Sequence, residues 1–514
     1  MTLLNLVLAL PALGFLALLF VPRDKPQVIR ALAIAVALIA FIASIGLATG
    51  LRSDVPGMQF ATDVIWIPSP EIHFHIGIDG VSLWLVILSA FLTPICILIS
   101  WRFIDKRVKE FYAFLLLLEF GLIGVFISLD LFLFYVFWEV SLVPMYFLIG
   151  IWGHERRIYA AVKFFLFTMS GSVLMLVGII YLYNRAGTFD YLAILNQMAG
   201  GKLSFTPGQE LLLFLAFFIA FAIKVPLFPL HTWLPDAHVE APSAGSVMLA
   251  SVMLKMGTYG LLRYCVPMFP EAARRCAPWI IVLAIIGIIY GALVAMVQPN
   301  MKKLVAYSSV SHLGFVVLGI FSFTQLGFDG AVYQMLNHGI STGALFVLVG
   351  YLYERRHSLA IADFGGVATP APWLSTVFMI TMLASIGLPT LNNFVGEYLV
   401  LQGAAQANFR WAVFAAIGVI LSACYMLWLY QRVFYGDTPE PVAEHVYDLN
   451  RREWAAVLPL VAMMVWMGVY TPSFLPPITR ANTAILDQSR MNVRFRVALP
   501  PAPYLTAREV PRAR

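Results

Sequence analysis

The chain has 514 residues, of which 61% are hydrophobic and 12% are charged. About a quarter of the residues of soluble domains are charged, so this composition excludes a soluble globular protein and indicates a polytopic helical membrane protein. The net charge of +6 is spread over the loops and gives no reason to expect nucleic acid as a partner.

Windows of about 20 apolar residues predict fourteen transmembrane spans and an all-α fold. In chain order the expected spans are 2–21, 28–50, 80–100, 111–128, 130–151, 160–184, 209–230, 243–266, 277–298, 302–323, 329–353, 374–402, 408–435 and 454–472. No basic residue precedes the first span and no small-residue cleavage site follows it. We therefore expect a membrane helix there rather than a signal peptide.

The charges of the loops predict how the spans are oriented. The loops after odd-numbered spans carry most of the Lys and Arg residues, including Arg102, Lys106, Arg107 and Lys109 after the third span. The positive-inside rule therefore places these loops in the cytoplasm. Both termini are then expected on the outer face.

Residues 51–79 contain two runs in which apolar and polar residues alternate, which predicts a short hairpin on the outer face. Its His73 and His75 point to one side of a strand and are either metal ligands or part of a polar strand face. The polar face is favoured because no third ligand lies nearby in the sequence.

Two other polar stretches, 185–208 and 436–453, are expected to be connectors. Residues 473–514 form a tail rich in Pro and Arg with little helical periodicity, and we expect it to lie on the surface of a partner.

The sequence carries no sign of a cofactor. Its four cysteines, Cys96, Cys265, Cys276 and Cys424, are scattered and form no metal-ligand or redox spacing. No Gly-rich nucleotide fingerprint follows a predicted strand. We therefore expect no metal, cofactor or redox centre in this chain.

Two apolar segments carry a lysine near the middle, Lys224 and Lys255. A lysine at the centre of a membrane helix costs at least about 2.5 to 3.5 kcal/mol, so such residues usually mark ion pathways. Lys224 stands just before Pro226 and Pro229, and a proline removes one helical hydrogen bond. Interrupted helices of this kind build ion sites in transporters, so helix 7 is expected to be discontinuous.

Other protonatable residues are expected at a similar depth. Glu139 stands near Pro144 in span 5, and Pro389 is expected to interrupt span 12 before Glu397. The predicted row of proton-transferring groups consists of Glu139, Lys224, Lys255, His312, His338 and Glu397, with Glu119 as a further candidate.

Each of these residues also has a structural interpretation. Glu139 and Lys224 could be a buried ion pair, although such pairs are often no better for stability than apolar packing. The histidines could be ordinary hydrogen-bonded core residues. The loop residues His231, Asp236 and His238 either collect protons or cap the broken helix, and the sequence does not decide between the two.

The interrupted spans 7 and 12 lie five spans apart, which predicts two five-helix repeats. Because five is odd, the repeats would have opposite orientations in the membrane. The expected domains are 1–110 with the hairpin, a first repeat at 111–266, a second at 277–435, a connector and last helix at 436–472, and the tail at 473–514.

Four segments carry a resemblance to a known family. They are FWEVSLVPM, AIKVPLFPLHTWLPDAHVEAPSAGSVMLASVMLKMG, AYSSVSHLGF and GLPTLNNFVGE. They resemble the antiporter-like membrane subunits of proton-pumping NADH:quinone oxidoreductase (respiratory complex I). These include the bacterial L, M and N subunits, mitochondrial NADH dehydrogenase subunit 4 and the related Mrp-type antiporter subunits. The family typically has lysine on the second broken helix, and Glu397 at that place indicates the M branch.

The resemblance implies a non-redox subunit of this oxidoreductase that moves protons while quinone is reduced elsewhere in the complex. It implies that Glu139 and Lys224 interact, that Lys255 is the central carrier, that His312 and His338 are relays, and that Glu397 is the terminal group. It further implies a place in a bacterial cytoplasmic (inner) membrane between L-like and N-like subunits and phospholipids, with FMN, iron–sulfur clusters and quinone in the partner subunits. An Mrp-type cation/proton antiporter subunit, a structural spacer and a hydrogenase membrane subunit are the alternatives.

Overall fold

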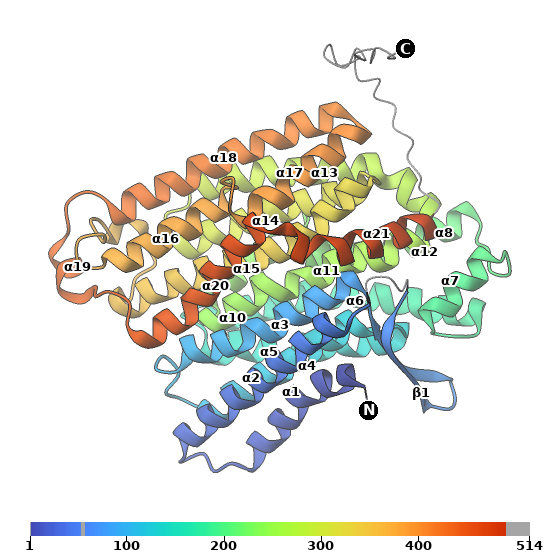
Figure 1. The fold of residues 1–514 in the computed structure, drawn as a ribbon, viewed down its shortest axis with the longest axis horizontal. Helices are drawn as coiled ribbons and strands as arrows, with labels where there is room; N and C mark the ends of the chain where they lie inside the picture. The colour runs from blue at the N-terminus through green and yellow to red at the C-terminus, as the bar shows by residue number, and fades with distance from the viewer. Residues whose placement is uncertain (1, 53–56, 490–514) are drawn as a thin grey trace, which may run out of the picture.

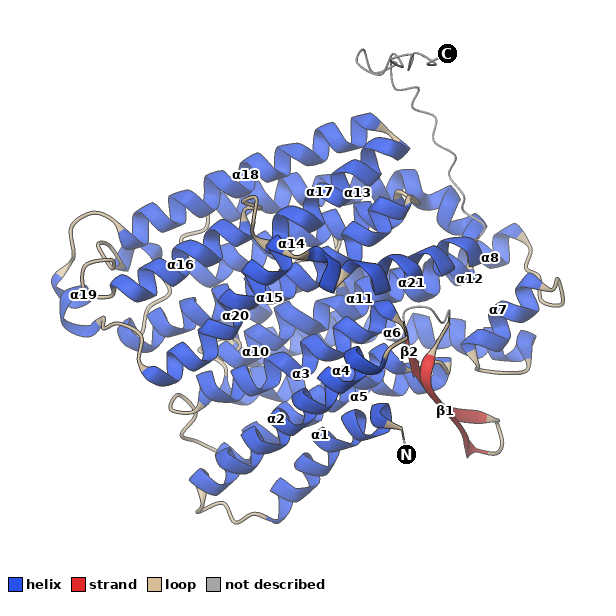
Figure 2. Cartoon of the chain, in the orientation of Figure 1, coloured by secondary structure: helices blue, strands red, loops and turns tan. Residues whose placement is uncertain are grey.

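The computed structural model describes residues 2–52 and 57–489. The long helices lie side by side in one bundle, and a small hairpin projects from one end (Figure 1). Figure 2 shows that helices make up nearly all of the described chain, with one two-stranded sheet. The all-α membrane fold is therefore confirmed.

The elements of the first half begin with the helices α1 Leu3–Phe20 and α2 Pro26–Gly50, followed by the strands β1 Gln59–Ile67 and β2 Ile72–Ile78. Next come α3 Gly80–Ser100, α4 Val108–Ile127, α5 Leu131–Trp152, α6 Arg157–Ala186, α7 Tyr191–Ala199, α8 Pro207–Lys224 and α9 Trp233–Glu240. A long helix then consists of α10 Ser243–Met248, π-helical η1 Leu249–Met253, α11 Leu254–Gly260, π-helical η2 Leu261–Cys265 and α12 Val266–Met268.

The second half begins with α13 Pro270–Met296, α14 Met301–Phe321, α15 Gln325–Arg356 and the 3-10 turn η3 Ile361–Asp363. It continues with α16 Pro372–Ser385, α17 Asn392–Ala407, α18 Phe409–Phe434, α19 Glu440–His445, α20 Arg451–Val469, the 3-10 turn η4 Thr471–Ser473 and α21 Leu475–Gln488.

Within the described residues, 13 helices are long and apolar enough to cross a membrane. They coincide with thirteen of the fourteen predicted spans, and the remaining predicted span, 374–402, coincides with the pair α16 and α17. The outer helices expose apolar side chains, such as Phe20 on α1 and Ile42 on α2. Such a surface is suited to lipid, whereas α14 and α15 are enclosed by other helices.

The predicted interruption of the seventh span, 209–230, is confirmed. α8 ends at Lys224, and a stretch of turns with Pro226 and Pro229 separates it from α9. Prolines leave carbonyl groups without a helical partner. Pro226 has no N–H for the Ala222 carbonyl, which instead accepts from Leu227 N over 2.8 Å. The Ile223 carbonyl, which Leu227 would otherwise reach, accepts from the Trp233 indole Nε1 over 2.9 Å.

The twelfth predicted span, 374–402, is also interrupted as predicted. α16 ends at Ser385 and α17 begins at Asn392, with Pro389 between them. In the gap the backbone at Gly387 has φ +79°, a left-handed conformation that glycine adopts readily. The Asn393 side chain then closes the gap, because its Nδ2 donates to the Ser385 carbonyl over 3.3 Å.

Three predicted loops contain helices. Each connector holds a short helix, α7 in 185–208 and α19 in 436–453. The start of the tail, predicted to lack helical periodicity, forms α21, which packs on α3 and α15 of this same chain. The rest of the predicted tail, 490–514, lies outside the described residues. Asp236 and His238 belong to α9 and not to a loop, because the chain resumes a helix directly after the prolines.

Two isolated backbone bridges bear on the predicted repeats. Asp130 pairs with Asp190 just before α5, and Asn300 pairs with Ala360 just before α14, with the same spacing along the chain. The first bridge lies at the hairpin end of the bundle, since Leu129 N donates to the His75 carbonyl over 2.8 Å. The second lies at the opposite end, where α5 ends, since Lys302 Nζ donates to the Ala241 carbonyl over 2.8 Å and His154 N donates to the neighbouring Glu240 carbonyl over 3.0 Å. The two inverted repeats stay a prediction, which this arrangement favours.

Candidate functional site

The centre of the bundle holds a buried contact between Lys255 and His338. Lys255 Nζ lies 2.6 Å from His338 Nδ1 and also donates to the Ala250 carbonyl over 2.6 Å. Both side chains are fully buried. The sequence predicted these two residues at one depth, and the structure brings them into direct contact.

A second buried pair continues from the first. His312 Nδ1 lies 2.8 Å from Glu397 Oε1, and the His312 and His338 ring centroids are 6.0 Å apart. The Nε2 atoms of both rings have no hydrogen-bond partner among the residues that the structure describes. Lys255, His338, His312 and Glu397 therefore form one file of neighbouring groups drawn from four helix segments, which we call the central relay.

Lys224 lies fully buried at the break. Its Nζ atom forms no hydrogen bond within the described chain and lies 5.4 Å from the ring centroids of Trp138 and Phe164. Cations over aromatic faces gain about 0.5 to 2 kcal/mol. Among the residues that the structure describes, the lysine is thus held by aromatic rings and not by a salt bridge.

Glu139 is the carboxylate whose charge acts on Lys224. No ion pair within 4.0 Å joins the two among the described residues, and Glu139 Oε1 is buried without a hydrogen-bond partner. The structure thus places the predicted pair near each other but separated. Lys224 and the central relay are also neighbours through their backbones. A Cβ added at Gly257 would lie 2.7 Å from the Phe221 carbonyl oxygen and 2.9 Å from Val225 N.

Glu119 on α4 takes no part in the central relay. It is fully buried, and neither carboxyl oxygen has a hydrogen-bond partner in the described part of the chain. Its role stays a prediction.

Sequence reasoning missed the π-helical turns on both sides of Lys255. In η1 the Leu254 N–H donates to the Leu249 carbonyl, five residues back. The Ala250 carbonyl in the same turn accepts a hydrogen bond from Lys255 Nζ. π-Turns occur often at functional sites. The segment LASVM is ordinary apolar sequence, so no residue type in it signals the turn.

An amide network around Glu397 was also missed. Gln334 Nε2 donates to Glu397 Oε1 over 3.0 Å, and Asn337 Nδ2 donates to Gln334 Oε1 over 3.2 Å. Asn392, at the start of α17, donates to the Asn337 carbonyl. A signal was present in Gln334, which lies four residues before His338 and therefore on the same face of α15.

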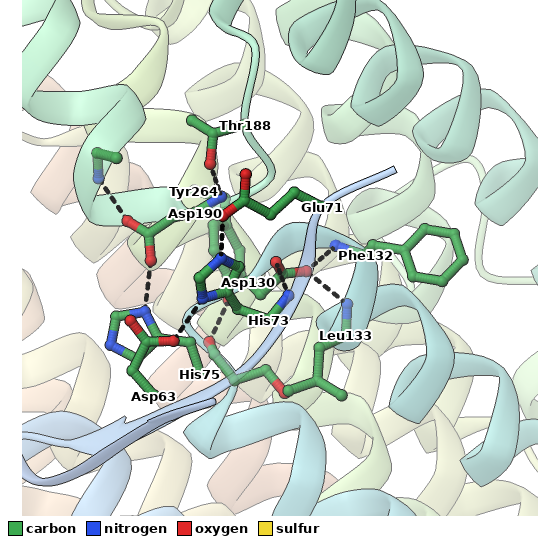
Figure 3. Close-up of polar contacts among 12 residues, drawn as sticks. Asp63, Glu71, His73, His75, Asp130, Phe132, Leu133, Thr188, Asp190 and Tyr264 are labelled. Atoms are coloured by element: carbon green, nitrogen blue, oxygen red, sulfur yellow. Dashed lines mark hydrogen bonds and ion pairs between the residues drawn. The ribbon is translucent and has the colours of Figure 1, made fainter. Parts of the chain in front are cut away.

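The predicted hairpin is confirmed, and its histidines contact carboxylates (Figure 3). His73 Nδ1 lies 2.6 Å from Asp63 Oδ1, and His75 Nδ1 is hydrogen-bonded to Asp190. No group of three or more His, Cys, Asp or Glu residues in the described ranges is arranged to hold a metal ion. The histidines therefore belong to a polar cluster that fastens the hairpin to α5 and α7.

Comparison with known proteins places this arrangement in a family. A model of the membrane domain shared by NADH:quinone oxidoreductase and Mrp antiporters matches residues 128–423. NADH-quinone oxidoreductase subunit M of Rhodobacter capsulatus is 47% identical over 89% of this chain and 90% of its own length. NADH-ubiquinone oxidoreductase chain 4 of Marchantia polymorpha is 44% identical over 91% of this chain and 94% of its own. The chain belongs to the NADH:quinone oxidoreductase/Mrp antiporter membrane-subunit family.

Solved structures of the family share the fold. A chain of respiratory complex I from Thermus thermophilus with bound NADH superposes with a TM-score of 0.85 at 33% identity, covering 94% of this chain and 99% of that one. A chain of the Mrp complex from Dietzia sp. superposes with a TM-score of 0.82 at 20% identity, covering 96% and 99%. The likeness to the Mrp chain shows the fold alone. Within the family, the structure therefore confirms a multi-pass membrane subunit.

Proposed function

We propose that this chain is the antiporter-like, proton-translocating subunit of the membrane arm of an NADH:quinone oxidoreductase. The central relay carries the proposal, because it is a continuous file of protonatable side chains buried between two interrupted helices. Buried ionisable groups of this kind mark proton paths in membrane proteins.

The proposed mechanism begins with Glu139 and Lys224. Two opposite charges about 4 Å apart interact by about 4 kcal/mol at an effective dielectric of 20. Moving Glu139 toward or away from Lys224 therefore changes how strongly the lysine holds its proton. Moving one charge against 100 mV costs about 2.3 kcal/mol. The interaction energy gained or lost when this pair forms or separates is therefore large enough to drive transport.

The proton released at Lys224 then enters the central relay. Lys255 accepts it and passes it through His338 and His312 to Glu397. The 6.0 Å between the two ring centroids leaves the unpartnered Nε2 atoms of both histidines as places for bridging water, because buried polar atoms without a protein partner usually bind ordered water.

The proposal extends to the surroundings of the chain. It places the chain in a bacterial cytoplasmic membrane, with both termini on the periplasmic face and L-like and N-like subunits and phospholipids as neighbours. FMN, iron–sulfur clusters and quinone belong to partner subunits, and this chain is non-redox. The support is the scattered cysteines and the excess of basic residues in the loops after odd-numbered spans.

Substitution at the first pair tests the proposal. In the assembled oxidoreductase, Glu139→Gln and Lys224→Met should abolish NADH-driven proton pumping, because no charge remains to switch. Pumping is measured with a pH-sensitive dye in vesicles, and assembly by the subunit composition of the purified complex. Wild-type pumping by an assembled Glu139→Gln enzyme would remove the pair from the mechanism.

An Mrp-type cation/proton antiporter subunit is the second candidate, favoured by the shared fold. The curated relatives at 44 to 47% identity are named as oxidoreductase subunits, and Glu397 stands where the antiporter branch typically has lysine. Mass identification of the subunits that purify with this chain separates the two candidates.

A further inference from the structure

A cavity of about 160 Å³ lies at the hairpin end of the bundle, away from the central relay. Its walls come from the start of α3, from α7, from α21 and from the π-helical turn η2. Its charged lining residues are Arg52, Arg263, Arg480 and Asp79. One water needs about 10 to 15 Å³ of such space, so a phosphate-sized group fits in the cavity.

The cavity carries an excess of positive charge. Arg263 is buried and donates from Nη2 to Asp79 Oδ2, so these two charges cancel. Arg52 and Arg480 are exposed, and neither has an ion-pair partner in the described ranges. Two guanidinium groups are therefore left for an anion. Arginine is well suited to phosphate, because its planar group can donate two parallel hydrogen bonds.

The buried wall of the cavity is held in place from several elements. Asp79 Oδ1 caps the first turn of α3. The Tyr191 hydroxyl group of α7 donates to the Arg263 carbonyl over 2.6 Å. This carbonyl needs a side-chain donor, because Pro267, four residues later, has no N–H. Arg263 Nε has no hydrogen-bond partner within the described chain. The wall is thus preorganised, and its guanidinium keeps an N–H group that no described residue uses.

An apolar stripe on α3 continues from the cavity. α3 lies between α2 on one side and α20 and α21 on the other (Figure 1). The residues of α3 that are not buried recur at helical spacing: Trp84, Ile87, Phe91 and Leu98. We call them the α3 stripe. Gly80, which lines the cavity, lies one turn before Trp84 on the same face of the helix.

Aromatic rings flank the α3 stripe on both sides. Phe474, just before α21, packs on Trp84 with ring centroids 4.8 Å apart. Phe41 of α2 packs on Phe91 with centroids 5.5 Å apart. The stripe therefore offers an apolar surface along the membrane-spanning part of α3, directly below a cationic cavity at the end of that helix.

This combination matches a phospholipid better than a free anion. A free phosphate ion would use the cavity alone, whereas a phospholipid would use the cavity with its headgroup and the α3 stripe with an acyl chain. The positive-inside rule places the hairpin end at the outer face, where basic residues are not in excess. A pair of unbalanced arginines there favours a negatively charged headgroup over a zwitterionic one.

We propose that Arg52, Arg263 and Arg480 bind the phosphate group of an acidic phospholipid of the outer leaflet, whose acyl chain lies along the α3 stripe. The binding is non-covalent and moves no proton. The inference goes beyond the proposed function, because it concerns a lipid site on the flank of the bundle and holds whether or not the central relay carries protons.

A photoreactive residue on the stripe tests the site. p-Benzoylphenylalanine takes the place of Ile87 in the complete complex, which is reconstituted into vesicles of equal parts phosphatidylglycerol and phosphatidylcholine. After irradiation, the mass of the molecule attached to this chain identifies it. We expect phosphatidylglycerol to be attached at least about fivefold more often, because one arginine near a membrane surface favours acidic lipid by about that factor. The same residue in place of Ile42, which is 65% exposed on α2, is the control and should attach both lipids equally.

Substitution of the exposed arginines links the preference to the cavity. Arg52→Gln combined with Arg480→Gln, in the complex that carries the photoreactive residue at position 87, should bring the ratio of the two lipids close to one. Arg410→Gln, on an exposed arginine of α18 outside the cavity, should leave the preference unchanged.

Three outcomes would overturn the lipid site. Equal attachment of both lipids at position 87 would show that the stripe is ordinary lipid-facing surface. An excess of phosphatidylglycerol that survives in the double arginine variant would show that the cavity does not select the headgroup. Attachment to another protein subunit would show that a protein partner, and not a lipid, covers the stripe.

Discussion

Lys224 and Glu397 occupy opposite ends of the proposed path in different surroundings. Lys224 Nζ has aromatic rings around it and no hydrogen-bond partner among the described residues. Glu397 Oε1 lies within hydrogen-bond distance of both His312 Nδ1 and Gln334 Nε2. Among the described residues no hydrogen bond fixes the lysine, whereas the carboxylate is held toward the central relay. Gln334 is therefore a positioning residue for the last proton transfer.

The first prediction concerns this amide. Gln334→Leu removes one donor from Glu397, and a hydrogen bond to a charged group contributes about 1.5 to 3 kcal/mol. The carboxyl group should therefore be held less firmly toward His312, and proton transfer along the central relay should slow. We expect an assembled enzyme that pumps more slowly and with an altered pH profile, measured by dye quenching in vesicles. Gln402→Leu, on the exposed bond to Tyr398, is the control.

A matching shift would also appear in Asn337→Leu, because Asn337 orients Gln334. An unchanged pH profile in Gln334→Leu would show that the amide only fills space.

At the scale of elements, backbone contacts position the lysines. Gly257 lets α11 lie directly on the end of α8, beside the break that follows Lys224. The second prediction is that Gly257→Ala destabilises this contact. The new methyl group would meet backbone atoms at 2.7 and 2.9 Å, which cannot move as a flexible side chain can. Overpacking typically costs about 1 to 3 kcal/mol, so thermal unfolding of the assembly should begin at a lower temperature.

Gly208→Ala is the matched control for this change. Gly208 lies in the first turn of the same α8, and a Cβ there would meet nothing within 4 Å. Alanine is also the better helix former. An equal loss of stability in both variants would refute the role of close backbone approach.

The hairpin is the element whose attachment should depend on pH. Burial lowers the pKa of His75, but the hydrogen bond and charge of Asp190 raise it more, so the net shift is upward. Burial raises the pKa of Asp190, but the hydrogen bonds from His75 and from the Ala193 N–H, together with the charges of the two histidines, outweigh burial, so the net shift is downward. The charges of Asp63 and His73 also act on His75. The charged contact between His75 and Asp190 (Figure 3) is therefore present at pH values between the lowered pKa of Asp190 and the raised pKa of His75.

The third prediction follows from these signs. A histidine with a raised pKa stabilises the fold fully below its unfolded pKa of about 6.5 and loses this contribution as pH rises through the folded value. Asp190 contributes above about pH 3.9, and its contribution is lost as pH falls through its lowered pKa. Spin labels on the hairpin turn and on α7 should report a longer distance as pH rises above neutrality. His75→Asn should remove this dependence.

Sequence reasoning predicted elements better than contacts. The spans, the hairpin and both interruptions have local causes, namely apolar length, alternation and the prolines at 226, 229 and 389. The contact of Lys255 with His338 joins residues 83 positions apart, so it depends on how helices pack and no local pattern encodes it. The turn η1 and helix α21 were missed for another reason, since packing selects them from sequence that fits several structures.

At the scale of the whole molecule, the buried charges act as one unit only if a disturbance at Glu139 reaches Glu397. The two residues lie in different predicted repeats, on α5 and α17. Groups that function in series show strongly non-additive effects, because losing either one already stops the process. Independent sites instead give effects that add.

The fourth prediction uses this difference. Glu139→Gln, Glu397→Gln and the double variant should all reduce pumping to nearly the same residual rate, since each breaks the same path. Two separate proton paths in the two halves would instead give partial losses in the single variants. The fraction of pumping left in the double variant would then be the product of the fractions left in the two single variants. Glu110→Gln, which removes a surface ion pair with Arg23, should combine additively with either change. The initial rate of acidification per NADH oxidised is the quantity to compare, because it separates lost pumping from lost turnover.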